Sequence, residues 1–145
     1  MTTAFSAIVA AVIGRLSEEP PVCDAIYRAR ANAIPETLDR AISVQFDQSL
    51  PNRGVMDGSP IDWSSRVTVE CFARSVIETG DLAVDPLLEA VFARLAADAT
   101  LGGVVGDLAI AGVEAEYTSD GKKTGWVRIT YIAEHRTDNL TLEQV

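Results

Sequence analysis

Hydrophobic residues recur at helical spacing in two separate stretches of the chain. In the first, from Thr3 to Ser17, they fall on one face at the i, i+3, i+4, i+7 spacing, as Phe5, Ile8, Val9, Val12, Ile13 and Leu16. In the second they form a stripe that runs out near Asp98, made of Leu87, Leu88, Val91, Phe92 and Leu95. Asp85-Pro86 precedes this stripe as a candidate N-cap with proline at the first helical position, although Asp81–Val84 could extend the helix backwards. The pattern predicts two amphipathic helices.

Between these helices, apolar and polar positions alternate with the period of two that is typical of strands. A short strand is expected near Ala25–Arg30, a second at Ala41–Asp47 and a long third at Trp63–Arg74. One face of the third strand is apolar, and the other carries Arg66, Thr68, Glu70 and Arg74. Phe72 lies among these polar residues, where it fits either an interface or an ordinary exposed aromatic. The glycine- and proline-rich stretch Ser49–Asp62 is expected to be a long mobile loop.

The last third of the chain predicts a β-hairpin from Asp107 to Thr137 that turns at Ser119–Lys122. Its first strand places Leu108 and Ile110 on one face, but beyond Ala111-Gly112 the apolar register moves by one residue. A one-residue shift beside a glycine is what a β-bulge leaves in a strand. The hairpin is therefore expected to bend at this point.

The predicted elements follow one another in the order α-β-β-β-α-β-β. We expect an α+β fold, with one mostly antiparallel sheet of about four or five strands and both helices packed on one face. At 145 residues, the whole chain (1–145) is expected to form a single domain. Its polar tail, residues 138–145, is expected to be loose.

Charge and cysteine usage exclude several function classes. The formal net charge of −9 argues against a broad surface for nucleic-acid phosphates or for an anionic membrane. No apolar run approaches the roughly 20 residues needed to span a bilayer, so no membrane-spanning helix is expected. Cys23 and Cys71 are too few for a disulfide framework, and we interpret both as buried reduced thiols of a cytosolic protein. A single disulfide bond between the two cysteines stays as an alternative.

The sequence shows no cluster of residues typical of catalysis. Its one histidine, His135, ends the last predicted strand, and the sequence offers it no orienting partner and no nucleophile. The glycines between Gly102 and Gly106 lack the lysine and the following helix of a phosphate loop, so we interpret them as a flexible connector. We therefore expect no enzyme, no cofactor and no metal site. The function classes that remain are a binding module and an assembly subunit.

Three segments of the chain resemble the tail terminator family of long-tailed bacteriophages, also called the minor tail protein U type. They are the R-x-x-x-I-P entry to the second strand at Arg30–Pro35, the D-x-T-L-G-G connector at Asp98–Gly103 and the V-R-I-T-Y strand at Val127–Tyr131. The order and composition of the elements carry the same resemblance over nearly the whole chain, from Ala4 to Thr137. The stretch Ser49–Asp62 matches the family least.

The resemblance implies a structural virion protein that forms a ring, usually a hexamer, on the finished tail tube. Such a ring ends polymerisation of the tube and provides the surface for head attachment. The implied partners are further copies of the chain, the tail tube protein and a head–tail connector protein, while DNA passes through the ring without specific binding. The implied location is the host cytoplasm during assembly and then the virion tail. Another head–tail joining or tail completion protein, or a non-enzymatic binding module without a virion role, stays open as an alternative.

Two surfaces are candidates for assembly contacts. The first combines the long loop with the polar face of the third strand, and consists of Arg53, Asp57, Arg66, Glu70, Phe72 and Arg74. The second is the outer face of the hairpin, and consists of Glu114, Glu116 and Arg128. The second surface is a candidate ring contact or lumen lining, because an acidic lumen would repel phosphate and let DNA slide. Glu114 and Glu116 also fit a plain solvated face.

Overall fold

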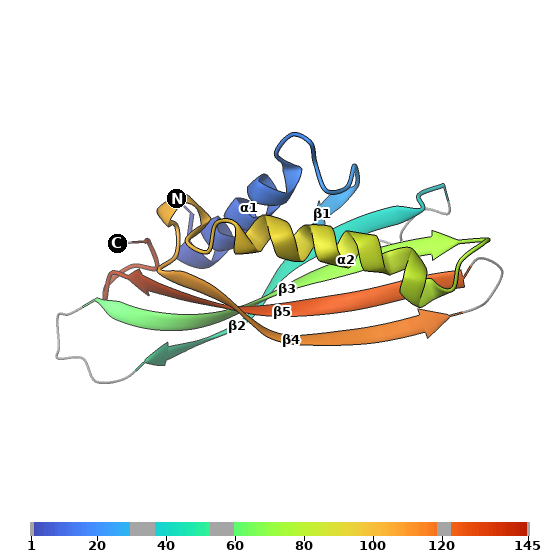
Figure 1. Cartoon of the computed structure of the whole chain (residues 1–145). Helices are drawn as coiled ribbons and strands as arrows, with labels where there is room; N and C mark the ends of the chain where they lie inside the picture. The colour runs from blue at the N-terminus through green and yellow to red at the C-terminus, as the bar shows by residue number, and fades with distance from the viewer. Residues whose placement is uncertain (1, 30–36, 53–59, 119–122, 145) are drawn as a thin grey trace.

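The computed structural model describes residues 2–29, 37–52, 60–118 and 123–144, and these form two α-helices and one five-stranded sheet. The elements are α1 (Ala4–Ser17), β1 (Ile26–Arg28), β2 (Arg40–Asn52), β3 (Ile61–Ser75), α2 (Gly80–Ala96), the short 3-10 helix η1 (Leu101–Gly103), β4 (Asp107–Thr118) and β5 (Lys123–Thr137). Their order confirms the expected α+β fold (Figure 1).

The strands lie in the order β1-β2-β3-β5-β4, so that β4 and β1 are the two edges of the sheet. All neighbours are antiparallel except β1 and β2, which are parallel. The two edges differ strongly in length. Strand β4 has 12 residues, whereas β1 has three and pairs only with Ile42–Val44 of β2.

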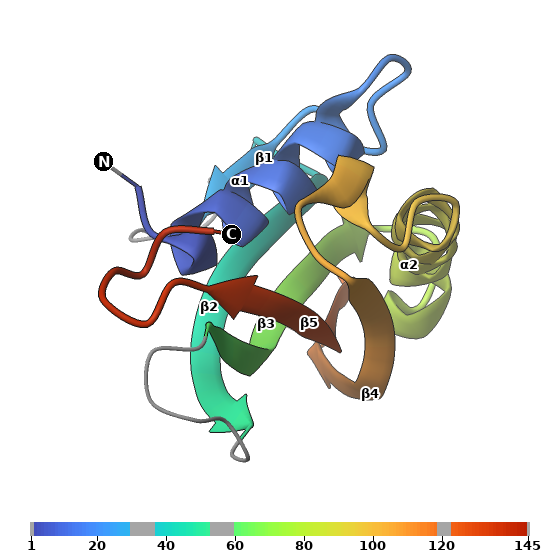
Figure 2. The ribbon, with the colours of Figure 1, turned by 90° about the vertical axis from the view of Figure 1, so that its left-hand side faces the viewer.

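Both helices pack on one face of the sheet, and the core lies between the two layers (Figure 2). Helix α1 contacts β1 and β2, while α2 contacts mainly β3 and β5. The alternation predicted for the central strands is confirmed, because their helix-facing residues are buried: Val67, Val69, Cys71 and Ala73 of β3, and Val127, Ile129, Tyr131 and Ala133 of β5. The opposite face of the sheet, called the open face below, carries no helix.

Two predicted boundaries are wrong. The stretch Ser49–Asp62 is not a loop throughout, because β2 continues to Asn52 and β3 begins at Ile61. A bulge after Phe46 shifts the register of β2, so the simple alternation ends there although the strand does not. The prediction that this stretch is mobile concerns residues 53–59, which lie outside the described residues.

Helix α2 begins earlier than the Asp85-Pro86 pair suggested, and the alternative that Asp81–Val84 extend it backwards is confirmed. Thr79 holds the N-cap position, Gly80 is the first helical residue and Pro86 lies inside the helix. The buried face of the helix already includes Gly80 and Val84, so packing on the sheet sets its start.

The bulge predicted in the hairpin is confirmed. Ile110 pairs with Tyr131 and Gly112 with Thr130, which leaves Ala111 as the extra residue of β4. Because of this extra residue, Val113 and Tyr117 point to the same side of the sheet as Ile110. The predicted turn at Ser119–Lys122 lies outside the described residues.

The C-terminal tail is hydrogen-bonded to the fold, which corrects the expectation of a loose end. The backbone N–H of Ala4 donates to the carbonyl of Leu142 at 2.7 Å, and the side-chain amide of Gln144 donates to the carbonyl of Val104 at 2.6 Å. Beside Val104, Gly102 and Gly103 have positive φ angles of 71° and 95°, which glycine adopts without strain. The glycine-rich connector is thus a defined turn.

Candidate assembly surfaces

The open face brings together the two sets of residues that the sequence assigned to separate surfaces. Arg128 of β5 is the cross-strand neighbour of Glu70 on β3 and of Glu114 on β4. Its guanidinium donates a hydrogen bond to the Glu70 carboxylate at 2.9 Å. These residues and Glu116 line a shallow groove of about 450 Å³. The predicted third-strand surface and the predicted hairpin surface are therefore parts of one face.

Phe72 is not the exposed aromatic that the sequence allowed. Only 3% of its surface is exposed, although it lies on the open face. The ring of Trp126 packs against it in a tilted, edge-on arrangement with centroids 4.7 Å apart, and the guanidinium of Arg74 lies 4.6 Å from its ring centre. Phe72 thus belongs to a small aromatic cluster within this face.

The remaining residues of the first predicted surface differ in accessibility. Arg66 is exposed on β3, and Glu70 and Arg74 are half-buried. Arg53 and Asp57 lie outside the described residues. The open face therefore presents charged groups around a covered aromatic cluster.

A second surface, which the sequence reading missed, follows the long edge strand. Ile110, Val113 and Tyr117 of β4 point to the helix side of the sheet, yet they are 46%, 52% and 52% exposed. They are exposed because α2 lies over β3 and β5 and contacts β4 only at its margin. The apolar alternation of β4 correctly gives the facing of these residues, but it contains no information about whether a helix covers them.

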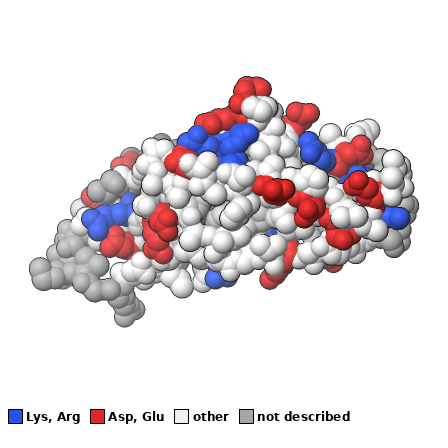
Figure 3. All heavy atoms as spheres, in the orientation of Figure 1, with Lys and Arg blue, Asp and Glu red and all other residues white. Residues whose placement is uncertain are grey.

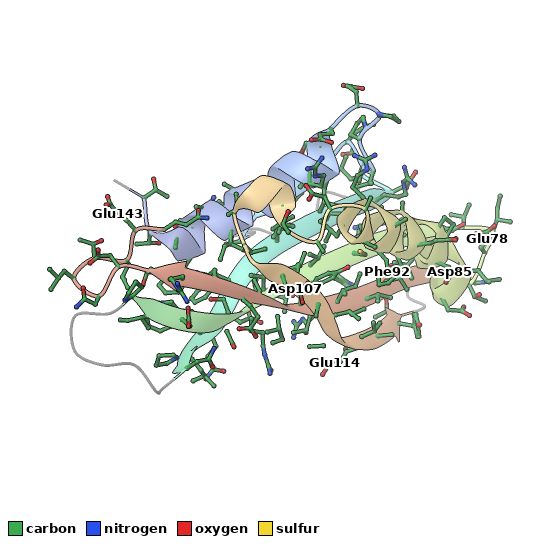
Figure 4. The ribbon with its side chains drawn as sticks, turned by 60° about the vertical axis from the view of Figure 1, so that its left-hand side comes forward. Glu78, Asp85, Phe92, Asp107, Glu114 and Glu143 are labelled. Atoms are coloured by element: carbon green, nitrogen blue, oxygen red, sulfur yellow. The ribbon has the colours of Figure 1, made fainter. Side chains whose placement is uncertain are left out.

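Helix α2 extends this apolar surface into a groove. Leu88 and the 45% exposed Phe92 lie beside Ile110 and Val113, and together with Ile129 they line a depression of about 340 Å³. Asp85 and Glu89 are the only charged residues of the lining that the structure describes. Figure 4 shows Asp85 and Phe92 on α2 beside the edge strand. We call this depression the α2–β4 groove.

The other edge of the sheet carries a groove of the same size. It also measures about 340 Å³, and it lies between α1 and the β1–β2 edge, where its apolar lining includes Phe5, Val9 and Phe46. Arg28 is the one charged residue among the described residues of the lining, and its guanidinium donates to the carbonyl of Ser6 at 3.1 Å. We call this depression the α1–β2 groove.

The single histidine has a partner that the sequence reading missed. The Nε2 atom of His135 lies 2.5 Å from the hydroxyl of Ser65, which in turn lies 2.8 Å from the hydroxyl of Ser49. Ser65 is fully buried and His135 is 7% exposed, and the Nδ1 atom has no hydrogen-bond partner among the described residues. Burial lowers the pKa of His135, against a smaller opposite effect of Glu134.

This serine–histidine pair lacks two features of an activated nucleophile. Among the described residues no carboxylate is hydrogen-bonded to the imidazole, and the Ser65 hydroxyl is buried. One signal in the sequence could have revealed the pair: Ser65 and His135 are polar residues that continue the apolar faces of β3 and β5. Their proximity follows from the strand register, in which Ser65 lies opposite Ala133 and Trp63 opposite His135.

Both cysteines are free and buried, as the sequence predicted. Burial raises the pKa of the Cys71 thiol to about 12, and the neighbouring Cys23 adds to the effect. Burial likewise raises the pKa of Tyr131 to about 12. Neither thiol has the electropositive, accessible surroundings of a reactive cysteine.

Within the described parts of the chain, no group of three or more histidine, cysteine, aspartate or glutamate residues could hold a metal ion. Among the same residues, no helix is long and apolar enough to cross a membrane. No protein-family model matches the chain, and no curated protein matches it. The surfaces described above are therefore the features on which a function can be argued.

Proposed function

We propose that this chain is a structural subunit of a ring that caps the tail tube of a long-tailed bacteriophage. In this role it ends polymerisation of the tube and presents the surface to which the head attaches. The proposal combines the resemblance of the sequence to tail terminators with the surfaces that the fold exposes.

The observation that carries the proposal is the exposed edge strand β4. All but one of its 12 residues are exposed, and it has a strand neighbour only on the β5 side among the described residues. A long edge strand of this kind has backbone groups free to contact another chain, and soluble proteins usually protect such edges. The apolar residues Ile110, Val113 and Tyr117 add contact area along the same edge. An assembly subunit accounts for an edge that an isolated domain would need to cover.

The charge of the molecule is compatible with a passage for DNA. Among the residues that the structure describes, the groove on the open face has three carboxylates, from Glu70, Glu114 and Glu116, and one cation, from Arg128. A lumen lined by such a face would repel phosphate, so that DNA could pass without being held. The further partners under this proposal are the tail tube protein and a head–tail connector protein, and the chain would move from the host cytoplasm into the virion tail.

Electron microscopy of tails assembled without this protein tests the role. Overlong and irregular tubes are expected, because polymerisation would have no stop. Tails of normal length that lack heads would instead support the alternative of a head–tail joining protein. Normal virions made without the protein would contradict both roles and favour a binding module outside the virion.

A further inference from the structure

We propose that copies of this chain associate head to tail, with the α2–β4 groove of one copy against the α1–β2 groove of the next. The inference deepens the proposed ring function, on which it rests for the closure of the ring. It specifies the two surfaces that meet and the charges that orient them.

The positions of the two grooves favour a head-to-tail contact. One groove follows the β4 edge of the sheet, and the other follows the β1–β2 edge at the opposite side of the same sheet. Two different surfaces on opposite sides of a subunit produce a heterologous contact, which repeats from copy to copy and closes when the rotation allows it.

The linings of the two grooves are alike in polarity. Each is mainly apolar and each contains a partly exposed phenylalanine, Phe92 at 45% in the α2–β4 groove and Phe46 at 38% in the α1–β2 groove. Aromatic side chains are enriched in the centres of interfaces because they bury a large area with little loss of conformational freedom. Contact between the grooves would remove both rings from water.

The charges of the two grooves are opposite, and this complementarity identifies a second copy as the occupant. Asp85 and Glu89 make the α2–β4 groove negative, whereas Arg28 makes the α1–β2 groove positive. None of the three forms an ion pair with another residue that the structure describes. Figure 3 shows acidic side chains along the region of α2. Each groove thus lacks the charge that the other supplies.

Charge reversal tests the contact through two single variants. Glu89→Arg cancels the negative charge of the α2–β4 groove, because Asp85 then balances the new arginine, whereas Arg28→Glu gives a copy whose two grooves are both negative. Each variant alone should associate more weakly than the unmodified chain by about tenfold, because neither retains the pairing of a negative groove with a positive groove at its junctions. Light scattering and sedimentation over a concentration series, up to the highest soluble concentration, measure the association.

Mixing the two variants is the decisive step. In an alternating assembly the introduced arginine meets the introduced glutamate at one junction, and the original Glu89 meets the original Arg28 at the next, so the equimolar mixture should regain most of the association of the unmodified chain. The double variant Glu89→Arg with Arg28→Glu should regain it as well. A contact of the α2–β4 groove with itself would not respond to Arg28→Glu, so weakening by both single variants followed by recovery in the mixture identifies a heterologous contact between the two grooves.

Glu134→Arg is the matched control, because it makes the same charge change at an exposed residue of the open face that lines neither groove. It should associate as the unmodified chain does, and far-ultraviolet circular dichroism should show all variants folded. Unchanged association of the Arg28→Glu variant, absence of recovery in the mixture, or an unmodified chain that stays monomeric throughout would each overturn the proposed contact. None of these outcomes depends on the tail phenotype, so a wrong contact is distinguishable from a wrong function.

Discussion

Gly80, the first residue of α2, packs its backbone directly against Gly125 of β5. A Cβ atom at Gly80 would lie 2.5 Å from the carbonyl oxygen of Thr124, and one at Gly125 would collide with the carbonyl of Gly80. We expect Gly125→Ala to push the start of α2 away from the sheet and to lower the free energy of unfolding by about 1–3 kcal/mol, the usual cost of overpacking. Urea denaturation followed by circular dichroism measures the change.

Gly14→Ala is the control for this prediction. Gly14 lies inside α1, and no atom lies within 4 Å of the position that a Cβ would take. Alanine should stabilise this helix by about 0.5–1 kcal/mol, since glycine is the poorer helix former. Destabilisation by both substitutions, or by neither, would contradict the close contact as the cause.

Arg94 of α2 holds the end of α1 in place. Its guanidinium donates to three backbone carbonyls, those of Arg15 at 3.0 Å, Glu18 at 3.0 Å and Pro20 at 2.6 Å. We expect Arg94→Ala to lower the free energy of unfolding by about 1–3 kcal/mol, because charged donors make the stronger hydrogen bonds and these carbonyls would lose theirs. Thermal and urea unfolding measure the loss.

Two comparisons make the Arg94 prediction specific. Arg94→Lys retains the charge but not the planar fork that reaches three acceptors, so most of the loss should remain. Arg66→Ala removes an exposed arginine and should change stability by no more than about 0.5 kcal/mol. An equal loss at Arg66 would show that the removed charge, rather than the three contacts, is responsible.

The buried His135 should make stability depend on pH. Burial holds its pKa in the folded state below the unfolded value of about 6.5, so between these two values the unfolded chain binds more protons. The stabilising contribution is therefore complete above about pH 6.5, and it is lost as the pH falls through the folded-state value.

His135→Gln should reduce this part of the pH dependence, because glutamine can contact the Ser65 hydroxyl without titrating. Urea denaturation at about pH 7.5 and about pH 5.5 should show a larger loss of stability in the unmodified chain than in the variant. Equal losses in the two proteins would exclude His135 as the group responsible and leave the carboxylates as the cause.

The sequence was sufficient to predict to which side of the sheet a residue points. It was not sufficient to predict whether another part of the chain covers that residue. Alternation places Val67, Phe72 and Ile110 on the correct sides of the sheet, and the shifted apolar register locates the bulge at Ala111. Which neighbours cover a face depends on the order of the strands and on the reach of the helices. For this reason Phe72 is buried on the face without helices, whereas Ile110 is exposed on the face with them.

Phe72 and Phe92 offer a matched pair of substitutions that separates folding from association. Phe72 is 3% exposed beneath Trp126, whereas Phe92 is 45% exposed in the α2–β4 groove. Phe72→Ala should lower the free energy of unfolding by about 3–5 kcal/mol, as for other buried phenylalanines. Phe92→Ala should lower it by about 1 kcal/mol or less, because its ring is already half in water.

The order of the two effects should reverse when association is measured. Phe92→Ala removes the aromatic ring of the proposed contact and should weaken self-association by about tenfold or more. Phe72→Ala should leave the association of the folded fraction unchanged, because the ring makes its contacts within its own sheet. Light scattering at a temperature where both variants are folded compares them. If only Phe72→Ala weakened association, the assembly contact would lie on the open face around Glu70 and Arg128, and the α2–β4 groove would have another role.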